Sequence, residues 1–260
     1  MKLGMSSAAF YGQMETEDQA TLLRSFPLDV CEVFLETHSE YSAAFGALVK
    51  ERLAGLSCLS VHPKGTQFEQ DLFGRSARQA QDALRAFRGV CEAGQALGAR
   101  YYVFHGPYSV SGRLRPEAVH ELTERMARLR GIAAEHGLEL LWENVSWCAL
   151  REPRDVRFMM EQLPDIGFVL DVKQALRAGV RPMDMLEAMG SRVRHVHALD
   201  QDAEGRLCLP GQGEQDWPAL MRRLRELGYE GAVILEPYEW MARDHEALRR
   251  SLDFLRGAGM

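Results

Sequence analysis

The 260-residue sequence has no closely spaced pair of cysteines and no long apolar run. Its five cysteines are scattered without a C-x-x-C pair, which argues against a disulfide scaffold and against a thiolate zinc site. No stretch approaches the roughly 18 apolar residues of a membrane-spanning helix, and no basic segment leads into an apolar one near residue 1. We therefore expect a soluble protein with no membrane partner, working in the reducing cytoplasm.

Positive charge is not in excess either, because 31 Lys and Arg residues stand against 37 Asp and Glu residues, for a net charge of −6. A nucleic-acid partner is not expected, since binding a polyanion takes a basic surface. Proline- or serine-rich linkers and low-complexity blocks are missing as well. With 46% hydrophobic residues the chain can form one large core, so we expect a single domain over residues 1–260. The predicted helix faces leave a monomer and a homo-oligomer both open.

Eight short apolar runs of β type recur along the chain, and seven of them lead directly into His, Asp or Glu. An apolar run followed by a polar residue is typical of a buried strand that presents the polar side chain at its C-terminal end. The runs are 2–6, 31–35, 58–61, 101–104, 140–142, 166–170, 193–196 and 232–235, and those after the first lead into Glu36, His62, His105, Glu143, Asp171, His197 and Glu236.

Helical patterns separate these runs. They cover residues 17–25, 39–53, 76–97, 116–137, 153–163, 183–189, 216–228 and 244–255, with Ser39 and Asp216 as N-caps and Pro116 and Pro153 in first turns. Strands that alternate with helices favour a parallel sheet, and eight such units close a barrel. We therefore predict an α/β fold, a (β/α)8 TIM barrel.

The C-terminal strand ends of such a barrel surround one pocket, so residues far apart in sequence can meet there. Among them, Glu143, Asp171, His197 and Glu236 are the strongest candidates for a metal site. Three carboxylates and one imidazole suit one divalent ion, with Mn²⁺ or Mg²⁺ favoured and Zn²⁺ or Co²⁺ possible. A cation is needed because converging carboxylates repel each other. Each residue alone could be a cap or a core histidine, but their recurrence at equivalent strand ends favours one site.

Four further residues are predicted to bind substrate. His62 and His105 occupy matching strand ends, and we favour substrate binding over a second metal because the loop 201–213 supplies no histidine. Lys173 follows Asp171 and could neutralise a substrate oxyanion, or equally be a surface or salt-bridged lysine. Gln174 comes next and is assigned to the same pocket.

Other strand-end residues have a weaker signal. Glu36 could close the pocket or be solvated, His195 is expected to pack in the interior, and the Gly-x-Gly at 211–213 more readily permits a tight turn than a phosphate cradle. Four aromatic residues could form an apolar wall for a sugar, although core packing is the commoner role for any one of them: Phe68, Tyr108, Trp147 and Trp240.

Several short motifs together give a resemblance that covers nearly the whole chain. They are Val61-His62-Pro63, Phe104-His105-Gly106, Leu141-Trp142-Glu143-Asn144, Val169-Leu170-Asp171, 195–200, 210–213 with Asp216-Trp217, and Leu235-Glu236. The chain resembles the xylose-isomerase-like TIM-barrel superfamily, which includes sugar phosphate isomerases and epimerases, inosose dehydratases, hydroxypyruvate isomerases and apurinic endonucleases. The set is specific for the superfamily but not for one reaction.

The resemblance implies that the four metal candidates match the single divalent-metal site of the ketose epimerase and isomerase branch, whose two glutamates also move the substrate proton. The sequence departs from that branch at Gln174, where a histidine is usual, and at Ala203, where an arginine often stands. It departs further from the endonuclease branch, because Gly205 and Leu207 replace an aspartate and a histidine that hold additional zinc.

From this resemblance we expect an isomerase or epimerase of a small sugar, ketose or sugar phosphate, working through an enediolate with Glu143 and Glu236 as acid and base. The expected partner is a small carbohydrate. A metal-dependent lyase or dehydratase of a polyol or keto-sugar is the alternative enzyme. A non-catalytic sugar-binding barrel is a different class of function, and a DNA repair nuclease is the least favoured.

Overall fold

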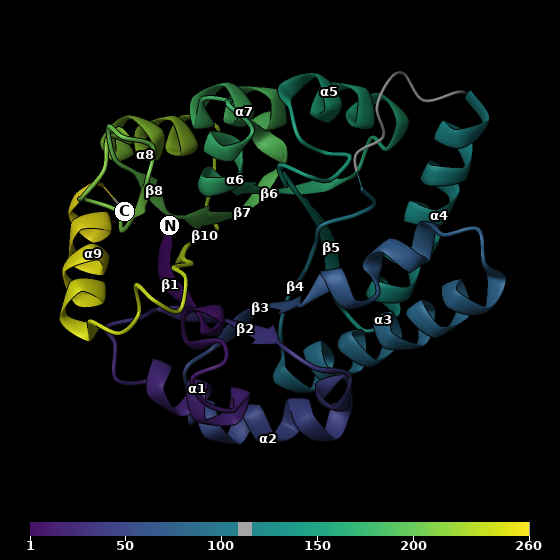
Figure 1. The fold of residues 1–260 in the computed structure, drawn as a ribbon, viewed down its shortest axis with the longest axis horizontal. Coiled ribbons are helices and arrows are strands. Elements are labelled where there is room, and N and C mark those ends of the chain that lie inside the picture. The colour runs from purple at the N-terminus through teal and green to yellow at the C-terminus, as the bar shows by residue number, and fades with distance from the viewer. Residues whose placement is uncertain (109–115, 260) are drawn as a thin grey trace.

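The computed structural model describes residues 1–108 and 116–259. Within this part of the chain, eight parallel strands close into a barrel in the order β1-β10-β7-β6-β5-β4-β3-β2, and helices surround it (Figure 1). Each barrel strand pairs with the barrel strand that precedes or follows it in the chain, and the first and last, β1 and β10, pair to close the ring; a short separate hairpin is formed by β8 and β9. The predicted (β/α)8 TIM barrel is confirmed.

Each predicted apolar run is a strand of the barrel. The strands are β1 Lys2–Ser6, β2 Val30–Leu35, β3 Cys58–Pro63, β4 Tyr101–Phe104, β5 Glu139–Glu143, β6 Gly167–Asp171, β7 Val193–Ala198 and β10 Ala232–Leu235. They are almost entirely buried, as expected of strands that have side chains of the barrel interior on one face and helices on the other. The hairpin β8 Asp200–Gln201 and β9 Leu207–Cys208 lies in the loop after β7.

The outer layer consists of helices whose apolar stripes pack on the barrel. The α-helices are α1 Thr16–Leu23, α2 Ala43–Leu53, α3 Ala77–Leu97, α4 Pro116–Glu135, α5 Pro153–Gln162, α6 Val172–Arg177, α7 Pro182–Met189, α8 Trp217–Glu226 and α9 His245–Gly257. Short 3₁₀ helices occupy η1 Ser7–Phe10, η2 His38–Glu40, η3 Gly65–Gln67, η4 Glu69–Phe73 and η5 Gly190–Arg192. In the part of the chain that the structure describes, no helix is long and apolar enough to cross a bilayer.

Most predicted helix starts are correct, and one is wrong. Ser76 and Asp216 are the N-caps of α3 and α8, as their side chains accept backbone N–H groups of the first turn. Ser39, however, lies inside η2, and α2 begins only after Ser42, whose side chain accepts the N–H of Phe45 at 3.2 Å. The reason is a capping box between Thr37 and Glu40 that forms a separate turn first.

The barrel interior changes from apolar to polar along the strands. Alternate residues of a strand share a face, so each strand contributes an inward-facing series. The earlier inward positions form apolar clusters, which include Tyr101, Val103, Leu141 and Val169 on one side and Val30, Ala232 and Ile234 on the other. The inward-facing residues nearer the C-terminal ends of the strands are buried polar or charged side chains. Ionisable groups are therefore concentrated toward the C-terminal mouth of the barrel.

Candidate metal centre

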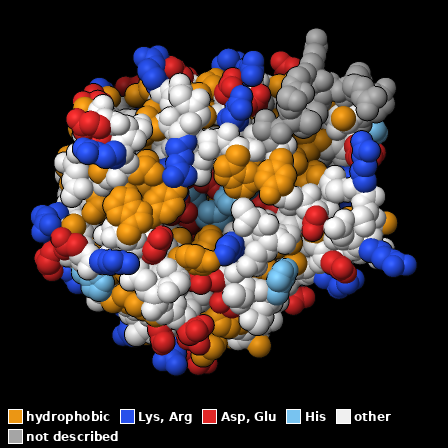
Figure 2. Space-filling view, in the orientation of Figure 1, with side chains coloured by type: hydrophobic (Ala, Val, Ile, Leu, Met, Phe, Trp, Pro, Cys, Tyr) orange, Lys and Arg blue, Asp and Glu red, His pale blue; other side chains and the backbone are white. Residues whose placement is uncertain are grey.

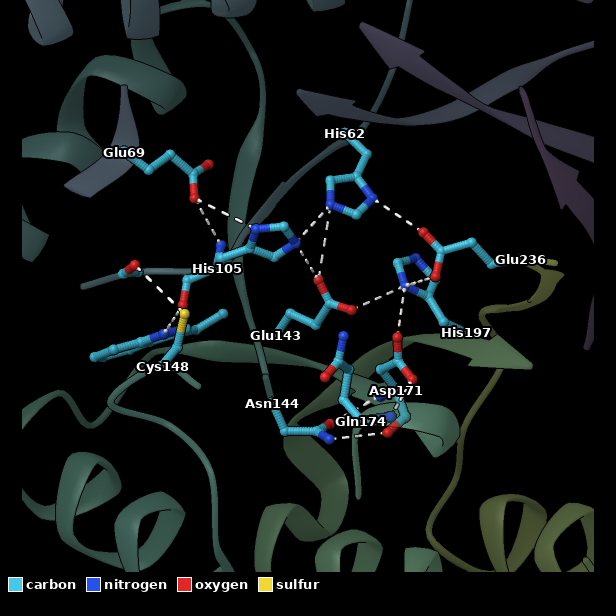
Figure 3. Close-up of polar contacts among 12 residues, drawn as sticks. His62, Glu69, His105, Glu143, Asn144, Cys148, Asp171, Gln174, His197 and Glu236 are labelled. Carbon is cyan, nitrogen blue, oxygen red and sulfur yellow. Dashed lines mark hydrogen bonds and ion pairs between the residues drawn. The ribbon is translucent and has the colours of Figure 1, made fainter. Parts of the chain in front are cut away.

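The four predicted metal ligands come together at the C-terminal ends of β5, β6, β7 and β10. Each of Glu143, Asp171, His197 and Glu236 offers a ligand atom within 4.8 Å of the others, and all four are buried (Figure 3). The Nδ1 atom of His197 lies 3.2 Å from Glu143 Oε1, 3.4 Å from Glu236 Oε2 and 3.8 Å from Asp171 Oδ2. One ring nitrogen therefore faces three carboxylates.

This donor set fits a divalent cation. Glu143 Oε2 and Asp171 Oδ2 are buried and accept no hydrogen bond from any residue that the structure describes. A buried carboxylate oxygen without a partner is costly, and a cation would satisfy it. Oxygen-rich sets with one imidazole are used for Mn²⁺ and Mg²⁺ and are compatible with Zn²⁺ and Co²⁺.

Local structure orients Asp171. It ends β6 and is the N-cap of α6, so its Oδ1 accepts the backbone N–H of Gln174 at 2.8 Å. The other oxygen is thereby turned toward His197. Burial raises the pKa of Asp171, although nearby Lys173 opposes that shift. The sequence did not predict α6, because a helix of six residues directly after a strand has too few positions to show a helical period.

Lys173 is buried and ion-paired, not a surface lysine. Its Nζ lies 2.8 Å from Glu236 Oε2 and 3.5 Å from Asp171 Oδ2. Burial alone would raise the pKa of Glu236. The positive charges of Lys173 and, to a smaller extent, His197 outweigh burial and lower this pKa to about 2. Glu236 is therefore an anion at neutral pH.

Gln174 lies in the first turn of α6, beside the cluster (Figure 3). Its side-chain oxygen accepts hydrogen bonds from the hydroxyl of Ser146 at 2.8 Å and from the N–H of Ser146 at 3.2 Å. The side chain thus connects α6 to the loop after β5. Its predicted contact with substrate stays a prediction.

The two predicted substrate histidines lie against the same cluster. Their Nε2 atoms are 2.9 Å apart, and His105 Nε2 is 3.1 Å from Glu143 Oε2, outside hydrogen-bonding geometry. Burial would lower the pKa of His62, but Glu236 and Glu32 raise it to about 10. His62, His105 and Glu143 also form a group of potential ligands within 4.8 Å of one another. Both substrate binding and a second ion therefore stay open for these histidines.

Two buried glutamates near the site were not anticipated from the sequence. Glu32, in the middle of β2, is fully buried and contacts His195 and His197. Glu36, the candidate at the end of the same strand, lies outside the cluster of carboxylates and imidazoles and is half-buried. Its carboxylate accepts a hydrogen bond from the side chain of Gln19 at 2.5 Å. A charged residue at an alternate position within an apolar run was the available signal for Glu32.

The second unanticipated glutamate is Glu69 of η4, in the loop after β3. It is 1% exposed, and its Oε2 accepts the backbone N–H of His105 at 3.0 Å. Burial raises the pKa of this carboxyl group to about 7. Nothing in the polar sequence of this loop distinguished Glu69 from its solvated neighbours.

The mouth of the barrel is a hollow with histidine side chains inside it and hydrophobic side chains on opposite sides (Figure 2). Tyr108 and Trp240 are 56% and 55% exposed, and Trp147 contacts both Tyr108 and His105. A cavity of about 430 Å³ beside the mouth is lined by Arg177, Arg206, Leu207, Tyr238 and Trp240. Phe68, by contrast, is buried against Tyr41 and belongs to the core.

The Gly-x-Gly segment has a structural role. Gly211 has a φ of +91°, and a side chain at Gly213 would collide with the carboxylate of Asp200. That carboxylate accepts the indole N–H of Trp217 at 2.9 Å. The segment is therefore part of a turn built around Asp200, as the sequence indicated.

The barrel and its buried cluster of carboxylates and imidazoles define a TIM-barrel protein with a donor set for a divalent cation. The model of the xylose isomerase-like TIM barrel family matches residues 17–258, and the chain belongs to that family.

Individual relatives are distant. The rhizopine catabolism protein MocC of Rhizobium meliloti is 24% identical over 193 residues, which is 59% of this chain and 59% of the relative. An inosose dehydratase of Lacticaseibacillus casei is 24% identical over 173 residues, covering 54% of this chain and 58% of the relative. The chain thus spans less than two thirds of the length of these relatives.

Solved structures share the fold over almost the whole chain. D-psicose 3-epimerase from Clostridium cellulolyticum H10, crystallised with D-tagatose, superposes with a TM-score of 0.77 at 15% identity, covering 99% of both chains. The IolI protein with a bound zinc atom gives a TM-score of 0.76 at 18% identity, covering 99% of this chain and 96% of that one.

Proposed function

We propose that the protein is a divalent-metal-dependent isomerase or epimerase of a small sugar, ketose or sugar phosphate. The observation that carries the proposal is the pair of buried carboxylates, Glu143 and Glu236, both within 3.4 Å of the same imidazole nitrogen of His197. Two carboxylates in one closed site can take a proton from one position of a bound substrate and return it at another.

The cation would be held by Glu143, Asp171, His197 and Glu236. Two carboxylate oxygens of this set are buried without a hydrogen-bond partner among the described residues, and a cation would compensate their charge. When bound, a divalent cation supplies Lewis-acid stabilisation of negative charge on neighbouring substrate oxygens. Mn²⁺ or Mg²⁺ is favoured by the three carboxylates, and the zinc atom bound to the IolI protein supports Zn²⁺ as an alternative.

Glu143 and Glu236 are assigned to proton transfer. Burial alone would raise the pKa of Glu143, but the imidazoles of His197 and His105 outweigh burial and hold it well below its usual range. Both glutamates are therefore ionised, and either can act first as the base that removes the proton α to the substrate carbonyl. After abstraction the first glutamate carries the proton. The enediolate is then protonated on the neighbouring carbon or on the opposite face by the other glutamate once that group has taken up a proton from solvent, and the first glutamate releases its proton to restore the starting state.

His62, His105, Lys173 and Gln174 are proposed to bind the substrate. The side chain of His105 is 15% exposed to solvent, so it is accessible from the mouth of the barrel. Lys173 places a cation beside Glu236, where it can also neutralise an anionic substrate oxygen. The polar and aromatic groups around the mouth are suited to a small carbohydrate.

A lyase or dehydratase of a polyol or keto-sugar is the second candidate. The similarity to an inosose dehydratase favours it, and the same α-proton abstraction would serve it. The difference comes after abstraction, because a dehydratase expels a hydroxyl group from the adjacent carbon instead of returning the proton.

An isotope experiment tests both reactions. The protein is incubated in D₂O with Mn²⁺ and a panel of ketoses, ketose phosphates and inososes, and products are followed by NMR. Deuterium on a carbon of an isomer or epimer supports the proposal, whereas an unsaturated or deoxy-keto product supports the dehydratase. If no member of the panel exchanges a proton or changes, a non-catalytic sugar-binding barrel becomes the better account. The Glu143→Gln variant is the control for adventitious exchange.

A further inference from the structure

Glu32 lies inside the barrel on the inner side of the candidate metal centre and has no part in the proposed proton transfer. Its carboxylate is fully buried, and its Oε2 is 3.2 Å from Nε2 of His197. A buried carboxylate among strand residues is expensive, so it persists only where neighbouring groups compensate it.

The two nitrogens of His197 face different partners. Nδ1 points to the three carboxylates of the candidate metal centre, and Nε2 points to Glu32. An imidazole that offers the lone pair of Nδ1 to a cation carries its proton on Nε2. In this arrangement Nε2–H donates to Glu32, which is the carboxylate–histidine–metal pattern known to orient metal-binding histidines.

Glu32 is itself held rigidly. The hydroxyl of Ser60 donates to Glu32 Oε2 at 2.8 Å, and His195 Nε2 lies 3.1 Å from the same oxygen. Ser60 is the register partner of Glu32 on the neighbouring strand β3, while His195 comes from β7 across the barrel. The carboxylate of Glu32 is therefore held in place by side chains of β3 and β7 in addition to its contact with His197.

We propose that Glu32 is a positioning residue that fixes the tautomer and the orientation of His197 for the cation. The proposal rests on the metal site of the proposed function, and it assigns Glu32 no contact with substrate. Fixing the proton on Nε2 keeps Nδ1 available as a ligand, and a hydrogen-bonded carboxylate increases the basicity of that nitrogen.

A competing role is that of a ligand. Glu32 Oε1 has no hydrogen bond among the described residues and lies 3.5 Å from His62 Nδ1. Glu32, His62, His197 and Glu236 form another group with potential ligand atoms within 4.8 Å of one another. A second cation bound by this whole group would need Nε2 of His197 as its ligand, so the imidazole would have to bridge two ions. The hydrogen-bonded arrangement requires no such bridge and is the one we infer.

The test is calorimetric titration of the metal-free protein with Mn²⁺ and Co²⁺, in the absence of sugar. We expect one equivalent to bind to the wild type, and Glu32→Gln to weaken binding about 10- to 100-fold with unchanged stoichiometry. Ser60→Ala is the matched control, because it removes another hydrogen bond to the same oxygen without touching His197. It should change affinity less than about threefold.

The outcomes separate the alternatives. Unchanged affinity in Glu32→Gln, with a lowered melting temperature of the metal-free protein, would mean that Glu32 only stabilises the barrel. Two equivalents in the wild type and one in the variant would make Glu32 a ligand of a second ion. If the wild type and Glu32→Gln bind the ion with the same affinity, only the role of Glu32 is overturned. If the wild type binds no ion at all, the metal site of the proposed function is refuted as well.

A measurement on the wild type covers the case in which the variant does not fold. In the Zn²⁺-loaded protein, long-range ¹H–¹⁵N NMR reports the tautomer of His197. We expect metal on Nδ1 and a slowly exchanging, hydrogen-bonded proton on Nε2. Metal on Nε2, or an Nε2 proton that exchanges freely with solvent, contradicts the proposal.

Discussion

The side chain of Asn144 pairs with the backbone of Asp171 in both directions. Its Nδ2 donates to the carbonyl oxygen of Asp171 at 2.8 Å, and its Oδ1 accepts the N–H of Asp171 at 2.8 Å (Figure 3). This double hydrogen bond joins the end of β6 to the residue that follows Glu143. It therefore sets the spacing between two of the proposed metal ligands.

Replacing Asn144 by alanine should destabilise the protein. The substitution leaves a buried N–H and a buried carbonyl without their partner, and an unsatisfied buried group costs about 1–3 kcal/mol. We expect the free energy of unfolding, measured by urea denaturation, to fall by about that amount. Ser146→Ala, in the same loop but bonded to Gln174, is the control and should cost less. Equal stability of Asn144→Ala and wild type would show that the pairing contributes nothing.

Replacing either proposed acid–base glutamate should abolish turnover while the fold persists. Glu143→Gln and Glu236→Gln keep the shape of the side chain but remove its capacity to carry the substrate proton, which we expect to lower the rate at least about 100-fold. The rate is measured on whichever sugar the wild type converts, and circular dichroism checks the fold. Near-normal rates in both variants would refute the assignment.

Gln174→His, which introduces the residue usual in the ketose epimerase branch, should change substrate preference or rate more than stability. Losing the hydrogen bonds to Ser146 costs about 0.5–1.5 kcal/mol, whereas a new imidazole beside the cluster alters the contacts offered to a substrate. The comparison is kcat/KM across a sugar panel against the melting temperature. If every tested sugar behaves as with the wild type, Gln174 does not reach the pocket.

Glu69 should make stability depend on pH. Its folded pKa of about 7 exceeds the usual value for glutamate because of burial, so the folded state binds the proton more tightly than the unfolded state. The contribution of Glu69 is therefore fully present below about pH 4.3 and is lost as pH rises through 7, at about 1.4 kcal/mol per unit of pKa difference.

Glu69→Gln, which stays neutral, should accordingly gain stability relative to wild type between pH 5 and pH 8, as measured by urea denaturation at each pH. Glu51→Gln, on an exposed position of α2, is the control and should show no such trend. A constant difference between Glu69→Gln and wild type across this range would mean that Glu69 ionises at the same pH in both states.

The sequence alone determined the barrel and the four proposed ligands. Buried apolar runs that alternate with helices have few other ways to cover both faces of a parallel sheet, and closure brings all C-terminal strand ends to one mouth. The positions of Glu143, Asp171, His197 and Glu236 follow from that topology, because each lies within one residue of the C-terminal end of its strand.

Only the tertiary structure revealed the buried residues that contact the four proposed ligands from inside the barrel. Glu32 and His197 are 165 residues apart, and neither sequence spacing nor local propensity shows that a mid-strand carboxylate on β2 meets an imidazole on β7. Their contact depends on the register of every strand between them, including the shift between Cys31 and Glu32. The direction in which a buried side chain points is decided by this accumulated register and by packing across the barrel, which a one-dimensional pattern does not contain.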